Sequence, residues 1–219
     1  MNLADYITSI SVLISAIAFV VGVNAWKREY IGRRRIELAE NVLALFYEAQ
    51  DAIREIRSPF GYYGEGATRT HSENETEEET RRLDNAFVVF ERYKKKEKLF
   101  AELHSLRYRF RATFGTNSSE PFLELNIIIR EIFEAARLLG TIYWKRIGNS
   151  MMSEEAHQNT LENVRKYEAI IWSHGYKDDE ISLRVQRAVE KIEEITKKES
   201  LMRISWFNRK TKIDPNNQI

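Results

Sequence analysis

A Glu-x-x-His pair, formed by Glu154 and His157, comes closest in this sequence to a metal-binding motif. A carboxylate-bridged di-metal site in a helical bundle needs two such pairs and further glutamates. The chain has four histidines, and none of the other three follows a glutamate at this spacing. Acidic residues are also common in the first turn of a helix, where they oppose the helix dipole. The sequence therefore predicts no metal site and no cofactor.

The glycine-rich segment GYYGEGATR, residues 61–69, is a second candidate site. It lacks the Lys-Ser/Thr pair and the preceding strand of a phosphate-binding loop. Its glycines allow the backbone to approach a ligand closely, and its arginine could meet an anion. Two interpretations stay open: a mobile connection between helices, or a loop that binds a ligand or a cytoplasmic protein partner. The candidate binding residues are Gly61, Gly64, Glu65, Gly66 and Arg69.

Other catalytic chemistry finds little support in the residues present. The chain has no cysteine, which excludes a thiolate nucleophile and a cysteine-ligated metal. None of the four histidines follows an arginine at the spacing of the HEPN ribonuclease motif. Glu65, Arg69 and His71 alone among titratable residues lie close enough in sequence to be tested as a group. We assign no catalytic residue and expect a protein that is not an enzyme.

The composition favours long helices. Only three prolines and nine glycines interrupt the chain, and no segment alternates convincingly as a strand would. The formal net charge of +1 gives no overall attraction to polyanions, so no nucleic-acid partner is expected. The predicted fold class is all-α.

Residues 6–26 carry no charge and are long enough to cross a bilayer as a helix of roughly 30 Å. A secretory signal would place its basic residues before the apolar run, whereas here they follow it. Basic residues stay on the cytoplasmic side, so we expect the N-terminus outside and everything after residue 26 in the cytoplasm. This predicts a single-pass protein of the bacterial inner membrane. The predicted membrane-surface residues are Lys27, Arg28, Arg33, Arg34 and Arg35.

Small side chains recur along one stripe of the predicted span. They stand three or four residues apart, which places them on a common helix face. Small residues let helix backbones approach closely in lipid, so the stripe favours a homo-oligomer. The alternative is that small residues fall there by chance. The predicted oligomerisation residues are Thr8, Ser11, Ser15, Ala18 and Gly22.

The chain beyond the span predicts a bundle of about five helices. The first continues from the membrane without a break until Pro59 ends it. After a long loop, residues 58–76, a capping box at Thr76 starts a helix that runs to about residue 114, bent or exposed at its charged middle. A third helix starts at Pro121 with Ser119 as its cap and continues to about residue 147. A fourth follows Ser153.

A fifth helix is expected over residues 177–198. This organisation gives an extracytoplasmic segment 1–5, a span 6–26, a cytoplasmic bundle 27–203 and a tail 204–219. We expect the polar end of this tail to be frayed. Its aromatic and basic residues, among them Trp206 and Phe207, could either touch the membrane surface or pack on the bundle.

The stretch RRRIELAENVLALFYEAQDAIREIRSPFGYYGEGATR is similar to bacterial single-span proteins that carry this juxtamembrane helix and loop. The similarity covers about a fifth of the chain. It implies an inner-membrane protein and transfers no catalytic residue. The sequence thus predicts a membrane-anchored interaction or scaffold module. A receptor or effector that uses the 61–69 loop is the alternative, and an enzyme of unrecognised type is a weaker one.

Overall fold

The computed structural model describes residues 3–62, 64–147, 151–173 and 179–211, with side chains omitted for 4–5 and 199–211. The chain is 85% helical, and no strand occurs within these described ranges. The all-α prediction is therefore confirmed. The chain divides into two compact units, one combining Met1–Asn41 with Thr196–Ile219 and the other formed by Val42–Ile195.

Helix α1 (Leu3–Ile56) contains the predicted span and continues past Gly32 without interruption, as the sequence predicts. Its apolar part is long and hydrophobic enough to cross a membrane, and none of the most apolar window is buried inside the protein. Every side chain from residue 6 to residue 24 is exposed. The helix ends shortly before Pro59, where the sequence places its end.

The sequence predicts one helix to about residue 114 that is bent or exposed at its charged middle. The structure has two helices instead, α2 (Glu77–Lys95) and α3 (Glu97–Phe114), which are separated at Lys96 within that charged segment. The predicted capping box is present at the start of α2, where the backbone amide of Glu79 donates to Thr76 Oγ1 over 3.2 Å. The amide of Thr76 donates in return to the Glu79 carboxylate over 3.3 Å. These bonds satisfy two amides at the helix end that have no partner within the helix.

Helix α4 (Glu120–Leu138) is shorter than predicted because the chain changes to a π-helical turn, η2 (Leu139–Tyr143), before a short α5 (Trp144–Arg146). Ser119 occupies the N-cap position of α4, as expected, but its side chain makes no capping hydrogen bond. A 3₁₀ turn, η1 (Thr116–Ser119), precedes α4, and the Ser119 hydroxyl donates within that turn to the Thr116 carbonyl. The predicted position of Pro121 in the first turn of the helix is confirmed.

Helix α6 (Glu154–Ile171) begins as predicted, with the Ser153 hydroxyl accepting from the amide of Ala156 at 3.3 Å. Helix α7 (Glu180–Thr211) extends beyond Lys198, where the sequence analysis ends it. No proline or glycine occurs between its first and last residues, so nothing stops the helix. The predicted contacts of Trp206 and Phe207 lie outside the described side chains.

The core of the 42–195 unit is built around α4, which packs against α2, α3 and α6. Ile128 and Ile132 of α4 are fully buried, as expected for a helix at the centre of this unit. Phe122 meets Phe46 of α1 edge to face at 4.9 Å and Phe110 of α3 at 5.4 Å between ring centroids. Such aromatic clusters dominate core energetics because each ring buries a large apolar area.

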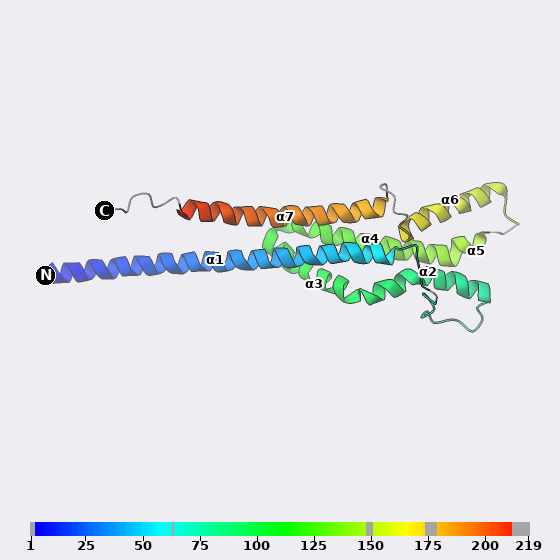
Figure 1. The fold of residues 1–219 in the computed structure, drawn as a ribbon, viewed down its shortest axis with the longest axis horizontal. Coiled ribbons are helices and arrows are strands. Elements are labelled where there is room, and N and C mark those ends of the chain that lie inside the picture. Colours follow the sequence, from blue (N-terminus) through cyan, green and yellow to red (C-terminus); the bar gives the residue numbers. More distant parts are fainter. Residues whose placement is uncertain (1–2, 63, 148–150, 174–178, 212–219) are drawn as a thin grey trace. The chain divides into compact units, whose positions relative to one another are not determined.

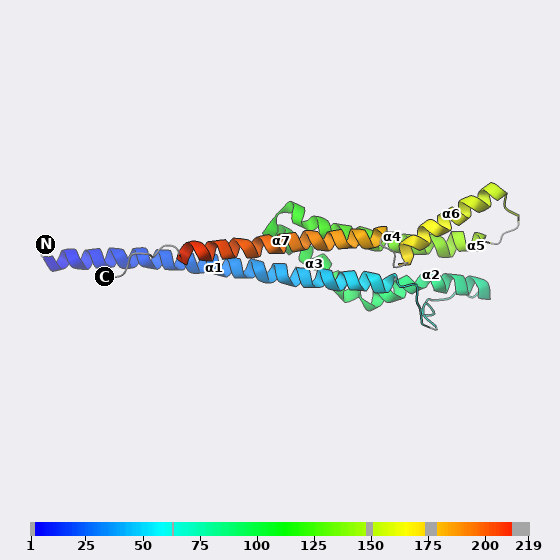
Figure 2. The same cartoon turned by 45° about the horizontal axis from the view of Figure 1, so that its top comes forward.

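Within the same unit, the beginning of α7 runs antiparallel to the end of α1, as Figures 1 and 2 show. The Tyr47 hydroxyl of α1 donates to the Glu193 carboxylate of α7 over 2.8 Å. Arg184 of α7 bridges Glu124 and Glu131 of α4. Polar contacts therefore fix α7 to two other helices of the unit.

Candidate functional site

Two arginines that are buried in the 42–195 unit define the candidate site. Arg57 follows the last residue of α1 and is 1% exposed, and Arg92 in the last turn of α2 is 6% exposed. A buried charge is costly unless it is paired and fully hydrogen-bonded. The partners of these two side chains therefore show which segments the fold holds together.

Arg92 joins the end of α1 to the 58–76 loop. It donates to the backbone carbonyls of Ser58 and Phe60 over 2.6 and 2.8 Å, and more weakly to those of the last α1 residues. Its guanidinium also holds the Glu65 carboxylate through two 2.7 Å hydrogen bonds. Those bonds lower the pKa of Glu65 despite its burial. A single side chain thus caps α1 and anchors the loop.

Arg57 ties the end of α1 to α6 and α7. It donates to the carbonyls of Ala169 and Ile170 at 2.9 and 2.8 Å, which lie in the last turn of α6. It also forms a two-pronged pair with Asp179, whose own carboxylate accepts from the amide of Ser182 in the first turn of α7. Burial alone would raise the pKa of Asp179, but Arg57 and Ser182 lower it below its ordinary value.

Trp172 stands between the two arginines. Its carbonyl accepts from Arg57 over 3.4 Å, and its ring lies 6.0 Å from the Arg92 guanidinium carbon. The second contact is at the outer limit of a cation–π interaction. The end of α1, the loop, and the α6–α7 connection therefore share one connected set of contacts.

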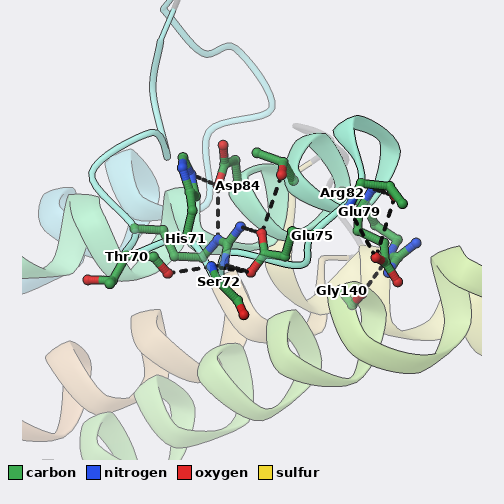
Figure 3. Close-up of polar contacts among 11 residues, drawn as sticks. Thr70, His71, Ser72, Glu75, Glu79, Arg82, Asp84 and Gly140 are labelled. Carbon is green, nitrogen blue, oxygen red and sulfur yellow. Dashed lines mark hydrogen bonds and ion pairs between the residues drawn. The ribbon is translucent and has the colours of Figure 1, made fainter.

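A third arginine fixes the distal part of the loop to α2. Arg69 binds the Glu75 carboxylate through two nitrogens and donates to Asp84 of α2 over 2.9 Å. His71 Nε2 lies 3.1 Å from the same Asp84 carboxylate oxygen, and Figure 3 shows this cluster. The Arg69 hydrogen bonds lower the pKa of Glu75 to about 2. Arg69 and His71 thus meet at Asp84, whereas Glu65 binds Arg92, so the three residues do not form one group.

The glycines of the loop differ in what surrounds them. Gly66 has a φ of +89°, and a Cβ there would collide with the carbonyl group of Asp84, so only glycine fits. Its amide donates to the Glu91 carboxylate over 2.9 Å. Gly61 and Gly64 are exposed, and a Cβ on Gly64 would meet nothing. The loop is thus bound to α2 at several points along its length.

Two aromatic side chains project from this bound loop. Phe60 is 84% exposed and Tyr62 is 87% exposed. Their backbone is held nonetheless, because the Phe60 carbonyl accepts from Arg92 and the Tyr62 amide donates to Glu65. The chain therefore presents large apolar groups to solvent on a fixed backbone, which is how protein-binding loops limit the entropy lost on association.

A second polar cluster, also drawn in Figure 3, surrounds the π-helical turn. Arg82 of α2 donates to the carbonyl of Gly140 over 2.8 Å, and Glu79 pairs with Arg82 and Lys145. A Cβ at Gly140 would lie 2.6 Å from the Ala86 methyl, so the glycine allows close helix contact. The π-helical turn η2 therefore packs directly against α2, and the contact is structural.

The predicted oligomerisation stripe lies on the exposed apolar part of α1. The hydroxyls of Ser11 and Ser15 donate to carbonyls one turn earlier in their own helix, over 2.9 and 2.8 Å. Gly22 has nothing within contact distance of a Cβ. The stripe therefore offers a surface of small groups whose serine hydroxyls are already satisfied.

Neither acidic clusters nor grooves in the described part of the chain offer a metal site. No group of three or more acidic or histidine side chains in these ranges could hold a metal ion. A groove of about 390 Å³ lies between α1 and the α2–α3 junction, with Glu48, Asp51 and Glu55 on one side and lysines on the other. Lys96 closes one end through a 2.6 Å pair with Glu55. The acidic and basic groups thus face each other across the groove, and Ala52 and Leu99 complete its lining.

Comparison with known proteins gives no relative. No family model, no curated protein sequence and no solved structure matches this chain.

Proposed function

We propose that this chain is a single-span protein of the bacterial inner membrane that holds a helical interaction module in the cytoplasm. The observation that carries the proposal is the exposure of α1: its large apolar side chains, such as Ile14, Ile17 and Phe19, are 57–72% exposed. Each such side chain gains roughly 1.5–3 kcal/mol on leaving water. A bilayer would cover all of them at once, because the uncharged part matches its thickness.

The charge pattern supports the orientation. Lys27 and Arg28 follow the uncharged segment directly, and further arginines lie within the next helical turns. Positive charges near the ends of a span stay in the cytoplasm, so the 42–195 unit would lie there too.

Membrane extraction tests the anchor. We expect the full chain to stay in the membrane pellet after alkaline carbonate extraction of cells that express it. Substituting Ile14→Arg and Ile17→Arg together should move most of the chain to the supernatant, because two charges at mid-span oppose insertion by several kcal/mol. The matched control, Ile14→Val with Ile17→Val, should remain in the pellet. A wild-type chain released by carbonate would contradict the anchor.

Self-association through the small-residue stripe forms part of the same proposal. Triple substitution of Ser11, Ser15 and Gly22 by leucine should abolish the signal of the span in a membrane two-hybrid assay. The larger leucine side chains would keep the backbones of two span helices apart. Val20→Leu adds bulk on another face and should leave the signal intact. Equal signals from wild type and the triple variant would remove the stripe from the mechanism.

The second candidate function, a receptor or effector, is favoured by Phe60 and Tyr62. We expect a photo-crosslinking residue at Tyr62 to capture a cytoplasmic protein in cells, and Phe60→Ala to reduce that capture. The control position is Tyr108, which is 59% exposed on α3 and should give no such product. The absence of any product specific to Tyr62 would count against a partner at the loop.

A further inference from the structure

Trp26, Tyr30 and Arg34 form a ladder along one face of α1, just beyond its uncharged part. The Trp26 and Tyr30 rings stack with 5.8 Å between centroids and 25° between planes. The Arg34 guanidinium carbon lies 5.5 Å from the Tyr30 ring, and its Nε donates to the Tyr30 hydroxyl over 3.3 Å. Each of the three residues lies one helical turn after the one before it, so each side chain contacts the next along the same helix face.

The ladder is open to its surroundings. Trp26 is 68% exposed and Tyr30 is 49% exposed. The hydrogen bond of Arg34 uses Nε, which leaves both terminal nitrogens of the guanidinium without a partner among the described residues. A guanidinium fork of this kind binds the oxygens of a phosphate group in two-pronged fashion.

The neighbouring charges add to this site. Lys27 lies two helical turns before Arg34 and so shares its face. Glu29, an acidic residue within the same turns, is occupied by Arg33 at 3.2 Å. Glu37, one turn after Arg34, also attracts its guanidinium. The five basic residues of 27–37 still outnumber these two acids, so the local charge at the ladder is positive.

We propose that the ladder is a binding site for the phosphate of an anionic phospholipid headgroup, an inference that rests on the proposed membrane anchor. Trp26 would mark the edge of the hydrocarbon, where amphipathic aromatic rings concentrate. Helical side chains tilt toward the N-terminus of their helix, so Arg34 leans toward the membrane. Its two terminal nitrogens then meet the phosphate, while Tyr30 orients the guanidinium through Nε. Tyr30 is a positioning residue and Arg34 the ligand-binding one.

The test uses the full chain, extracted from bilayers that contain equal amounts of phosphatidylglycerol and phosphatidylcholine. Native mass spectrometry then measures which lipid stays bound. We expect the wild-type chain to retain phosphatidylglycerol preferentially. Arg34→Gln should reduce that preference about tenfold, which is typical of losing hydrogen bonds between charged groups. Tyr30→Phe keeps the stack but removes the hydroxyl, and should give an intermediate loss.

Arg28→Gln is the matched control, because it removes the same charge from another face of α1. We expect it to change the preference by about twofold at most, since only the general surface charge is altered. Equal losses for Arg28→Gln and Arg34→Gln, or no lipid preference in the wild type, would overturn the site. If the lipid site fails but the chain still resists carbonate extraction, the proposed membrane anchor is unaffected. If the chain does not insert into membranes at all, the anchor itself is contradicted, and the lipid site with it.

Discussion

The guanidinium of Arg57 and the carboxylate of Asp179 lie 122 residues apart in sequence, yet they are joined by two hydrogen bonds of 2.9 Å. Both side chains are almost fully removed from solvent, at 1% and 8% exposure. The pair brings the end of α1, the end of α6 and the start of α7 to one point. This junction, together with Arg92, determines how the helices around the 58–76 loop are held.

Removing the Arg57 charge should strongly destabilise the 42–195 unit. We expect Arg57→Met to lower the free energy of unfolding by about 3–5 kcal/mol, because the buried Asp179 carboxylate would lose its positive partner and several helix-end carbonyls would lose their donor. Pulse proteolysis in urea on the detergent-solubilised chain would measure this change. Arg54→Met is the control. Among the residues that the structure describes, Arg54 pairs only with the exposed Asp51, so this change should alter stability by less than about 0.5 kcal/mol.

The loop should lose stability in acid. The pKa of Glu75 is lowered to about 2 by Arg69, so the paired carboxylate stabilises the folded state fully above the unfolded pKa of 4.5. That stabilisation is lost as the pH falls from about 4.5 to about 2. Stability measured against pH should therefore fall over this window in the wild type and more shallowly in Glu75→Gln. Parallel curves would show that the Arg69–Glu75 pair contributes nothing.

Two glycines of the loop should respond differently to alanine. Gly64 and Gly66 both have positive φ values, +81° and +89°, so each alanine is strained by about 1–2 kcal/mol. Only at Gly66 would the new Cβ also collide with α2, at the Asp84 carbonyl. Hydrogen exchange of residues 58–76 should therefore accelerate clearly more in Gly66→Ala than in Gly64→Ala. Equal acceleration would mean that the loop does not lie against α2.

Helical periodicity and capping residues predicted most of the helices correctly. The capping box at Thr76 and the serine cap at Ser153 located two helix starts because these signals act over only a few residues. The predicted end of α7 was wrong because the chain after Lys198 contains no proline or glycine to stop the helix before Thr211. The π-helical turn after Leu138 was missed because no local pattern in the sequence distinguishes it from continued α-helix.

The buried arginines were missed for a different reason. Arg57 follows Ile53 by one turn and so continues the apolar stripe of α1, and Arg92 follows Val89 in the same way on α2. An arginine on the apolar stripe of a helix was therefore the only feature of the sequence that could have indicated burial of these side chains. Their partners could not be predicted, because Asp179 and the carbonyls of α6 reach Arg57 only through the tertiary fold.

The orientation of the anchor is the central claim, and thiol accessibility tests it most directly. The chain has no cysteine, so Leu3→Cys and Met151→Cys each carry a single thiol, at positions 80% and 95% exposed. Spheroplasts that express either variant are treated with a maleimide that does not cross membranes. The account predicts labelling of Leu3→Cys in intact spheroplasts and of Met151→Cys only after lysis. Labelling of Met151→Cys before lysis would contradict it.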